Sequence, residues 1–187
     1  MNGIRTVLSA VLAGTLVNAF PATAAAAVDG CPAQICRPVS ALRSGAGAIA
    51  ARAAMEMIGI PYSWGGGGVR GPGFGIGKGA RTLGFDCSGL TEYAWARAGV
   101  PIGTTTHEQW RSGIRVAKEQ VEPGDLVFYD NDPGSPGPEH VAVAVDATRM
   151  VHAPQTGQFV RVDPLDRPTF MGVVRPSETA ANLDPSA

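Results

Sequence analysis

A strict alternation of side chains runs through His140-Val141-Ala142-Val143-Ala144-Val145-Asp146. Period-two alternation is typical of a β-strand, because successive side chains point to opposite faces of a sheet. The pattern places Val141, Val143 and Val145 on one face, and His140 with the two alanines on the other. Further strands are predicted at Leu126–Tyr129, Met150–Ala153, Val160–Val162 and Met171–Arg175.

The chain before Pro123 follows a helical period instead. Ile49, Ala53 and Met57 recur every four residues within a first predicted helix, Ala41–Ile58. Two more helices are predicted, Cys87–Ala98 and the shorter Thr104–Gly113. Helices followed by an antiparallel sheet of about five to six strands predict an α+β fold.

Composition narrows the class of protein. The 187 residues include 25 Gly and 15 Pro, charged side chains make up 17%, and the formal net charge is −1. The low charge excludes a coiled coil, and clustered glycines exclude collagen. A nearly neutral chain gives no electrostatic reason to bind nucleic acid. The length and the 44% hydrophobic content predict one loop-rich domain, which we expect to be a monomer.

The N-terminus has the layout of a secretory signal peptide. Arg5 precedes the apolar run Val7–Val17, and Ala22-Thr23-Ala24 supplies the small residues of a cleavage site. A run of 11 residues is shorter than the roughly 20 that span a bilayer. We therefore expect residues 1–24 to direct secretion to the cell envelope, with no stable membrane insertion after their removal. The alternative is a buried N-terminal helix.

Residues 25–47 are predicted to form a linker, and residues 177–187 a disordered tail. The linker holds Cys31 and Cys36, for which a disulfide is the simplest interpretation in an exported chain. A metal site would need further ligands nearby, and the sequence offers none. The domain proper is expected to span residues 48–176.

Cys87 is then the one cysteine without an expected disulfide partner. It follows Asp86, the predicted N-cap of the second helix, and helix N-termini favour a thiolate and offer backbone N–H groups to an oxyanion. These properties suit a nucleophile. The alternative is a buried, inert cysteine.

A nucleophilic cysteine needs a base, and the base needs an orienting group. His140 and His152 lie 12 residues apart on two predicted neighbouring strands. An odd-length loop such as Ala147–Arg149 would pair Ala144 with His152, and both imidazoles would then share one face. Two unrelated surface histidines are the alternative.

Five blocks resemble, in order, the NlpC-type cell-wall peptidases, a similarity that covers roughly residues 48–175. They are Pro61-Tyr62-Ser63-Trp64-Gly65-Gly66, Phe85-Asp86-Cys87-Ser88-Gly89-Leu90, Pro123-Gly124-Asp125-Leu126-Val127-Phe128, His140-Val141-Ala142-Val143 and Met150-Val151-His152-Ala153.

The resemblance implies a papain-like α+β fold and hydrolysis of peptide stems in peptidoglycan, at the bond from the γ-carboxyl of D-glutamate to a diamino acid. It implies Cys87 as nucleophile, His140 as base and His152 as the polar third member, with no metal or organic cofactor. Candidate oxyanion or substrate contacts are Tyr62, Asp86 and Ser88.

The segment between the first two blocks departs from the family pattern. Residues 67–83 carry Arg70, Lys78 and Arg81 but no acidic side chain, and ten glycines fall between Gly65 and Gly84. One interpretation is a solvated flexible loop. The other is a groove lip whose three cations meet carboxylates of the peptide stem.

Other functions stay open at this stage. The same fold could bind peptidoglycan without catalysis, or the thiol could serve an amidase or acyltransferase. A thiol oxidoreductase is disfavoured, because four residues separate Cys31 from Cys36 and no helix is predicted after them.

Overall fold

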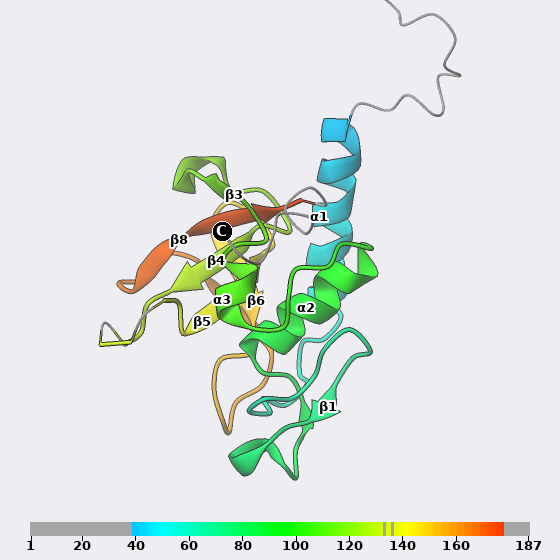
Figure 1. Cartoon of the computed structure of the whole chain (residues 1–187), viewed down its shortest axis with the longest axis vertical. Coiled ribbons are helices and arrows are strands. Elements are labelled where there is room, and N and C mark those ends of the chain that lie inside the picture. The colour runs from blue at the N-terminus through cyan, green and yellow to red at the C-terminus, as the bar shows by residue number, and fades with distance from the viewer. Residues whose placement is uncertain (1–38, 133, 136, 178–187) are drawn as a thin grey trace, which may run out of the picture. The chain divides into compact units, whose positions relative to one another are not determined.

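The computed structural model describes residues 39–132, 134–135 and 137–177 (Figure 1). The predicted signal peptide, the Cys31–Cys36 pair and residues 178–187 of the predicted tail lie outside these residues. No helix in the described part of the chain is long and apolar enough to cross a membrane.

Six antiparallel strands form the central sheet, in the order β3-β8-β4-β5-β6-β7. Three α-helices precede all six of these strands in the chain, so the predicted α+β fold is confirmed. The bounds are α1 (Val39–Met55), α2 (Cys87–Arg97), α3 (Thr106–Gln109), β3 (Gly113–Val116), β4 (Leu126–Tyr129), β5 (His140–Ala144), β6 (Arg149–His152), β7 (Arg161–Pro164) and β8 (Phe170–Pro176). Two 3₁₀ turns, Gly77–Gly79 and Lys118–Gln120, and a small sheet of β1 (Gly73–Phe74) and β2 (Leu83–Gly84) complete the elements.

Two hydrophobic cores lie on opposite faces of β5. Val141 and Val143 pack with α1 and α2, which cover one face of the sheet (Figure 1). Ala142 and Ala144 belong to the second core, around Met150. The predicted division of this strand into two faces is therefore confirmed, and both faces are buried.

Helix α1 buries its small residues. Gly47, Ala50 and Ala54 are buried, whereas Ile49, predicted to lie in the core stripe, is 46% exposed. The prediction is wrong there because the face of α1 that packs against α2 and the Pro123–Gly124 turn is the one with Gly47, Ala50 and Ala54, and Ile49 lies on the opposite face. The helix also begins at Val39, so residues 39–47 of the predicted linker are helical.

Strand β3 is not predicted from the sequence, which instead predicts that the third helix continues to Gly113. Thr105 and Glu108 form a capping box that starts α3, and the helix ends after one turn at Gln109. Ile114 of β3 is 55% exposed, since β3 is an edge strand paired only with β8. An edge strand buries fewer of its side chains, so the sequence of β3 shows less of the apolar–polar alternation from which a strand is predicted.

The Gly-rich segment is ordered by contacts with the segment that precedes it. Ser63 Oγ donates hydrogen bonds to the carbonyls of Gly79 (3.1 Å) and Thr82 (2.7 Å). Gly67 has a φ of +83°, and a Cβ there would lie 2.2 Å from the ring of Phe85. Glycine is thus required where the segment passes over the core.

Two glycines of α1 make a matched test of this packing. A Cβ at Gly47 would lie 2.5 Å from the Pro123 carbonyl oxygen, whereas nothing lies within 4 Å of one at Gly45. We expect Gly47→Ala to lower the free energy of unfolding by about 1–3 kcal/mol through overpacking. Gly45→Ala should raise it by about 0.5–1 kcal/mol through helix propensity. Urea unfolding measures both, and equal effects at the two positions would contradict the packing of α1.

Candidate active site

The Asp86 carboxylate fixes the start of α2 and therefore the position of Cys87. Its Oδ1 accepts hydrogen bonds from the Gly89 N–H (2.7 Å) and the Ser88 hydroxyl (3.2 Å). Its Oδ2 accepts one from the Gly65 N–H at 3.0 Å. The predicted N-cap is confirmed, and the same carboxylate ties the Gly-rich segment to the helix.

A cleft of about 570 Å³ opens beside Cys87. It brings together five of the predicted site residues: Tyr62, Asp86, Cys87, Ser88 and His140. His152 is 1% exposed and lies behind His140 rather than in the cleft. The Cys87 thiol donates to the Glu139 carbonyl at 4.0 Å, so the sulfur lies beside the residue that precedes His140.

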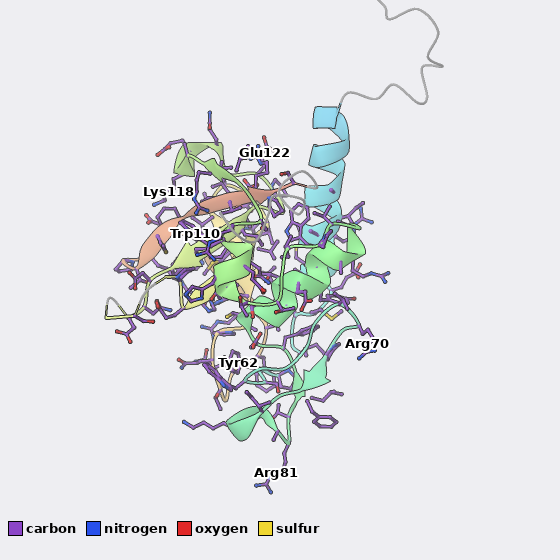
Figure 2. All side chains as sticks on the ribbon, viewed as in Figure 1. Tyr62, Arg70, Arg81, Trp110, Lys118 and Glu122 are labelled. Atoms are coloured by element: carbon purple, nitrogen blue, oxygen red, sulfur yellow. The ribbon has the colours of Figure 1, made fainter. Side chains whose placement is uncertain are left out.

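The three predicted cations of the groove lip are exposed. Lys78 lines a second cavity beside the cleft, while Arg70 and Arg81 line neither of the two. Figure 2 shows Arg70 and Arg81 at separate outer edges of the domain, away from Tyr62.

A chain of hydrogen bonds leads away from His140 into the protein. His140 Nε2 lies 2.8 Å from His152 Nδ1, and His152 Nε2 lies 2.9 Å from Asp163 Oδ2. The Asp163 carboxylate only accepts and is the nearer partner of His152 Nε2, since the Arg167 guanidinium lies 3.4 Å from that nitrogen. We therefore place the His152 proton on Nε2 and its acceptor lone pair on Nδ1. His140 then carries its proton on Nε2, and its Nδ1 is left with a free lone pair.

The β5–β6 hairpin places the two imidazoles on one face. Val143 pairs with Val151 and Ala144 with Met150, and the odd-length loop predicted from the sequence is confirmed. The predicted pairing of Ala144 with His152 is wrong by two residues. Asp146 accepts hydrogen bonds from Thr148 and Arg149, which closes the turn earlier than expected.

Asp163 was not predicted as a site residue. It lies on β7 opposite Met150, one residue past the predicted end of that strand at Val162. Although burial raises it, hydrogen bonds from Arg161 and His152 lower the pKa of Asp163 to about 2. Arg167 also contacts Asp163 Oδ2, at 2.5 Å. The alternation that begins at Arg161 reaches Asp163 two residues later. Extending the predicted strand that far would have identified Asp163 from the sequence.

Burial keeps Cys87, His140 and His152 neutral. Desolvation, with the nearby His152 and Arg167, lowers the pKa of His140 to about 3. Desolvation lowers the pKa of His152 to about 4, against the opposing effect of Asp163. Desolvation and the Asp86 carboxylate raise the pKa of Cys87 to about 12. The free site therefore favours a thiol beside a neutral imidazole, in place of the thiolate expected from the helix N-terminus alone.

Donors for a developing oxyanion lie next to the sulfur. The Cys87 N–H belongs to the first turn of α2, where no preceding helical carbonyl can accept it, whereas the Ser88 N–H is already held by the Asp86 carboxylate. Burial, together with the charge of the nearby Asp86 carboxylate, raises the pKa of Tyr62, so its hydroxyl keeps its proton. The arrangement combines a thiol, a base with a free lone pair, and hydrogen-bond donors.

The cleft is acidic. Asp86, Glu92 and Glu139 line it, and among the described residues no lysine or arginine does. In the same part of the chain, no group of three His, Cys, Asp or Glu side chains could hold a metal ion. The residues present suit thiol chemistry on a ligand that is neutral or cationic near Asp86.

Comparison with known proteins matches residues 59–175 to the model of the NlpC/P60 family. Peptidoglycan endopeptidase RipA of Mycolicibacterium smegmatis is 41% identical over 114 residues, 61% of this chain and 22% of that protein. RipB of Mycobacterium tuberculosis is 40% identical, over 61% of this chain and 46% of that protein. The match thus spans less than half the length of these relatives.

Comparison with solved structures also finds proteins of this family. The peptidoglycan hydrolase RipB of Mycobacterium tuberculosis superposes with a TM-score of 0.66 and 37% identity, covering 78% of this chain and 72% of that one. RipD of the same species, described as a non-catalytic NlpC/p60 domain protein adapted to peptidoglycan binding, has a TM-score of 0.62 and 32% identity, covering 70% and 96%.

The buried histidines predict how stability depends on pH. Their folded-state pKa values of about 3 and about 4 lie below the value of about 6.5 for an unfolded histidine. As the pH falls below 6.5, the unfolded chain binds more protons than the folded one, so the free energy of unfolding decreases. We expect a loss of up to about 1.4 kcal/mol per pH unit for each imidazole. Urea unfolding between about pH 7 and pH 4.5 measures it.

The matched variant is His152→Gln, which removes one of the two buried imidazoles. Its unfolding free energy should depend less steeply on pH than that of the unmutated chain, whatever its absolute stability. Identical slopes for the two proteins would show that His152 is not held neutral by the fold.

Proposed function

The chain belongs to the NlpC/P60 family, whose domains have the papain-like α+β fold predicted for it, and on that basis we propose that it is a cysteine endopeptidase of peptidoglycan. One observation carries the proposal: Cys87 and His140 line the same cleft, and His140 is oriented by His152 and Asp163. The names of the relatives support peptidoglycan as substrate.

We propose that the bond cleaved joins the γ-carboxyl of D-glutamate to a diamino acid. A gamma-D-glutamyl-L-lysine dipeptidyl-peptidase of Bacillus cereus, 33% identical over 61% of this chain and 30% of that protein, supports this choice. Peptides of this kind carry amines and carboxylates at separated positions, which suits a cleft with acidic walls.

The attack begins with the Cys87 thiol and the His140 imidazole both neutral. His140 Nδ1 takes the proton of the Cys87 thiol as the sulfur adds to the scissile carbonyl carbon, and a C–S bond forms. The protonated His140 still donates from Nε2 to His152, whose own N–H donates to Asp163. The carboxylate thus stabilises the cation that forms on His140, without taking the proton itself.

The tetrahedral oxyanion accepts hydrogen bonds from the Cys87 backbone N–H at the start of α2 and from the Tyr62 hydroxyl. When it collapses, the C–N bond breaks and His140 gives its proton to the leaving amine. Water, deprotonated by His140, then hydrolyses the thioester and restores the Cys87 thiol.

Peptidoglycan lies outside the cytoplasmic membrane, so this function requires export. We propose that residues 1–24 are the signal peptide and that the mature chain acts at the cell envelope as a monomer. The order of Arg5, the apolar run and the small residues supports it. N-terminal sequencing of the exported protein tests the boundary.

A second candidate function is peptidoglycan binding without cleavage, as the description of RipD shows for a family member. Catalysis is supported instead by Cys87 and His140 in one cleft, together with the hydrogen-bonded series from His140 through His152 to Asp163. Product analysis also separates an endopeptidase from an amidase or acyltransferase, because each breaks or forms a different bond.

Incubation of the full chain with purified muropeptides tests the proposal. We expect fragments whose masses correspond to cleavage after D-glutamate. Cys87→Ala and His140→Ala should each lower turnover by at least about a thousandfold, since they remove the nucleophile and its base.

The matched control is His107→Ala, which removes an exposed imidazole that does not line the cleft. It should leave turnover within about twofold of the unmutated chain. Muropeptide binding without any product from the unmutated chain would reject catalysis in favour of the binding function.

A further inference from the structure

A second cavity, of about 640 Å³, adjoins the catalytic cleft. Tyr62, Trp64 and Gln155 line both, so the two hollows are continuous across these side chains. The far wall of the second cavity comes from Ile76 and Lys78 of the Gly-rich segment. A ligand bound at Cys87 can therefore extend into it.

The wall of the second cavity is held in place. The Ile76 N–H donates to the Trp64 carbonyl at 2.8 Å, and a Cβ at Gly79 would lie 2.5 Å from that same carbonyl oxygen. Yet Trp64 is 57% exposed and Ile76 is 65% exposed. A fixed hollow that presents two large apolar side chains to water is typical of a binding surface.

The two hollows differ in charge. The cleft is lined by three acidic side chains, whereas Lys78 is the single charged side chain among the described residues that line the second cavity. A ligand that spans both is favoured when its negative charge lies at the Lys78 end and away from Asp86.

We propose that the second cavity binds the C-terminal end of the stem peptide, with its free carboxylate paired to Lys78 and a small apolar side chain against Trp64 and Ile76. A stem peptide that is not cross-linked ends in a free carboxylate, and that end departs with the leaving amine. This inference rests on the proposed function and assigns the second cavity to the leaving fragment. Of the three cations of the Gly-rich segment, it gives this role to Lys78 alone.

Two synthetic stem peptides test it, identical except that one ends in a carboxylate and the other in a carboxamide. With the full chain, Lys78→Met should raise KM for the carboxylate peptide about fivefold, as for a partly exposed ion pair, and leave kcat unchanged. For the carboxamide peptide, Lys78→Met should change neither constant. Arg81→Met, which removes an exposed cation of the same segment, should behave as the unmutated chain with both peptides.

Calorimetric binding of both peptides to the Cys87→Ala variant separates this inference from the proposed function. If the unmutated chain cleaves neither peptide but Lys78→Met weakens binding of the carboxylate peptide alone, the proposed cleavage fails and the carboxylate site stands. An equal effect of Lys78→Met on both peptides, or none on either, overturns the site. A preference for glycan-bearing peptides that is independent of Lys78 overturns it in favour of a sugar on Trp64.

Discussion

The carboxylate of Asp163 determines where the protons lie in the site. A neutral imidazole has one N–H, so an acceptor that fixes one nitrogen also fixes the role of the other. Through a hydrogen bond of 2.9 Å, Asp163 fixes which nitrogen of His152 carries the proton. Through a hydrogen bond of 2.8 Å, His152 does the same for His140. The lone pair left on His140 Nδ1 is what the proposed cleavage requires of its base. Arg161 and Arg167 keep Asp163 ionised, which maintains the whole series.

The fold brings these groups together from separate parts of the chain. Neighbouring strands β5, β6 and β7 each contribute one member of the series, and helix α2 contributes Cys87. Asp86 anchors the helix start and the Gly-rich segment at once, so Cys87 and the wall beyond Trp64 are positioned by the same carboxylate. Burial of the imidazoles costs stability at low pH and keeps the base unprotonated at neutral pH.

Local patterns were sufficient to predict much of this arrangement. The cap before Cys87 and the alternation from His140 are properties of neighbouring residues, and the parity of one hairpin loop placed His152 on the face of His140. Asp163 could not be predicted in the same way, because its role depends on a third strand whose end the pattern placed one residue short. Ile49 was assigned to the core because the apolar period favours large side chains, whereas α1 buries the face made of its small residues.

The central claim is that Asp163 sets the tautomer of His140, and ¹⁵N NMR of the histidine rings in the full chain at neutral pH measures it directly. We expect His140 to be protonated at Nε2 and free at Nδ1, and this preference to be lost in Asp163→Ala. In Asp166→Ala, which removes an exposed carboxylate three residues away, the preference should remain. A proton on His140 Nδ1 in the unmutated chain, or a tautomer unchanged by Asp163→Ala, would contradict the account.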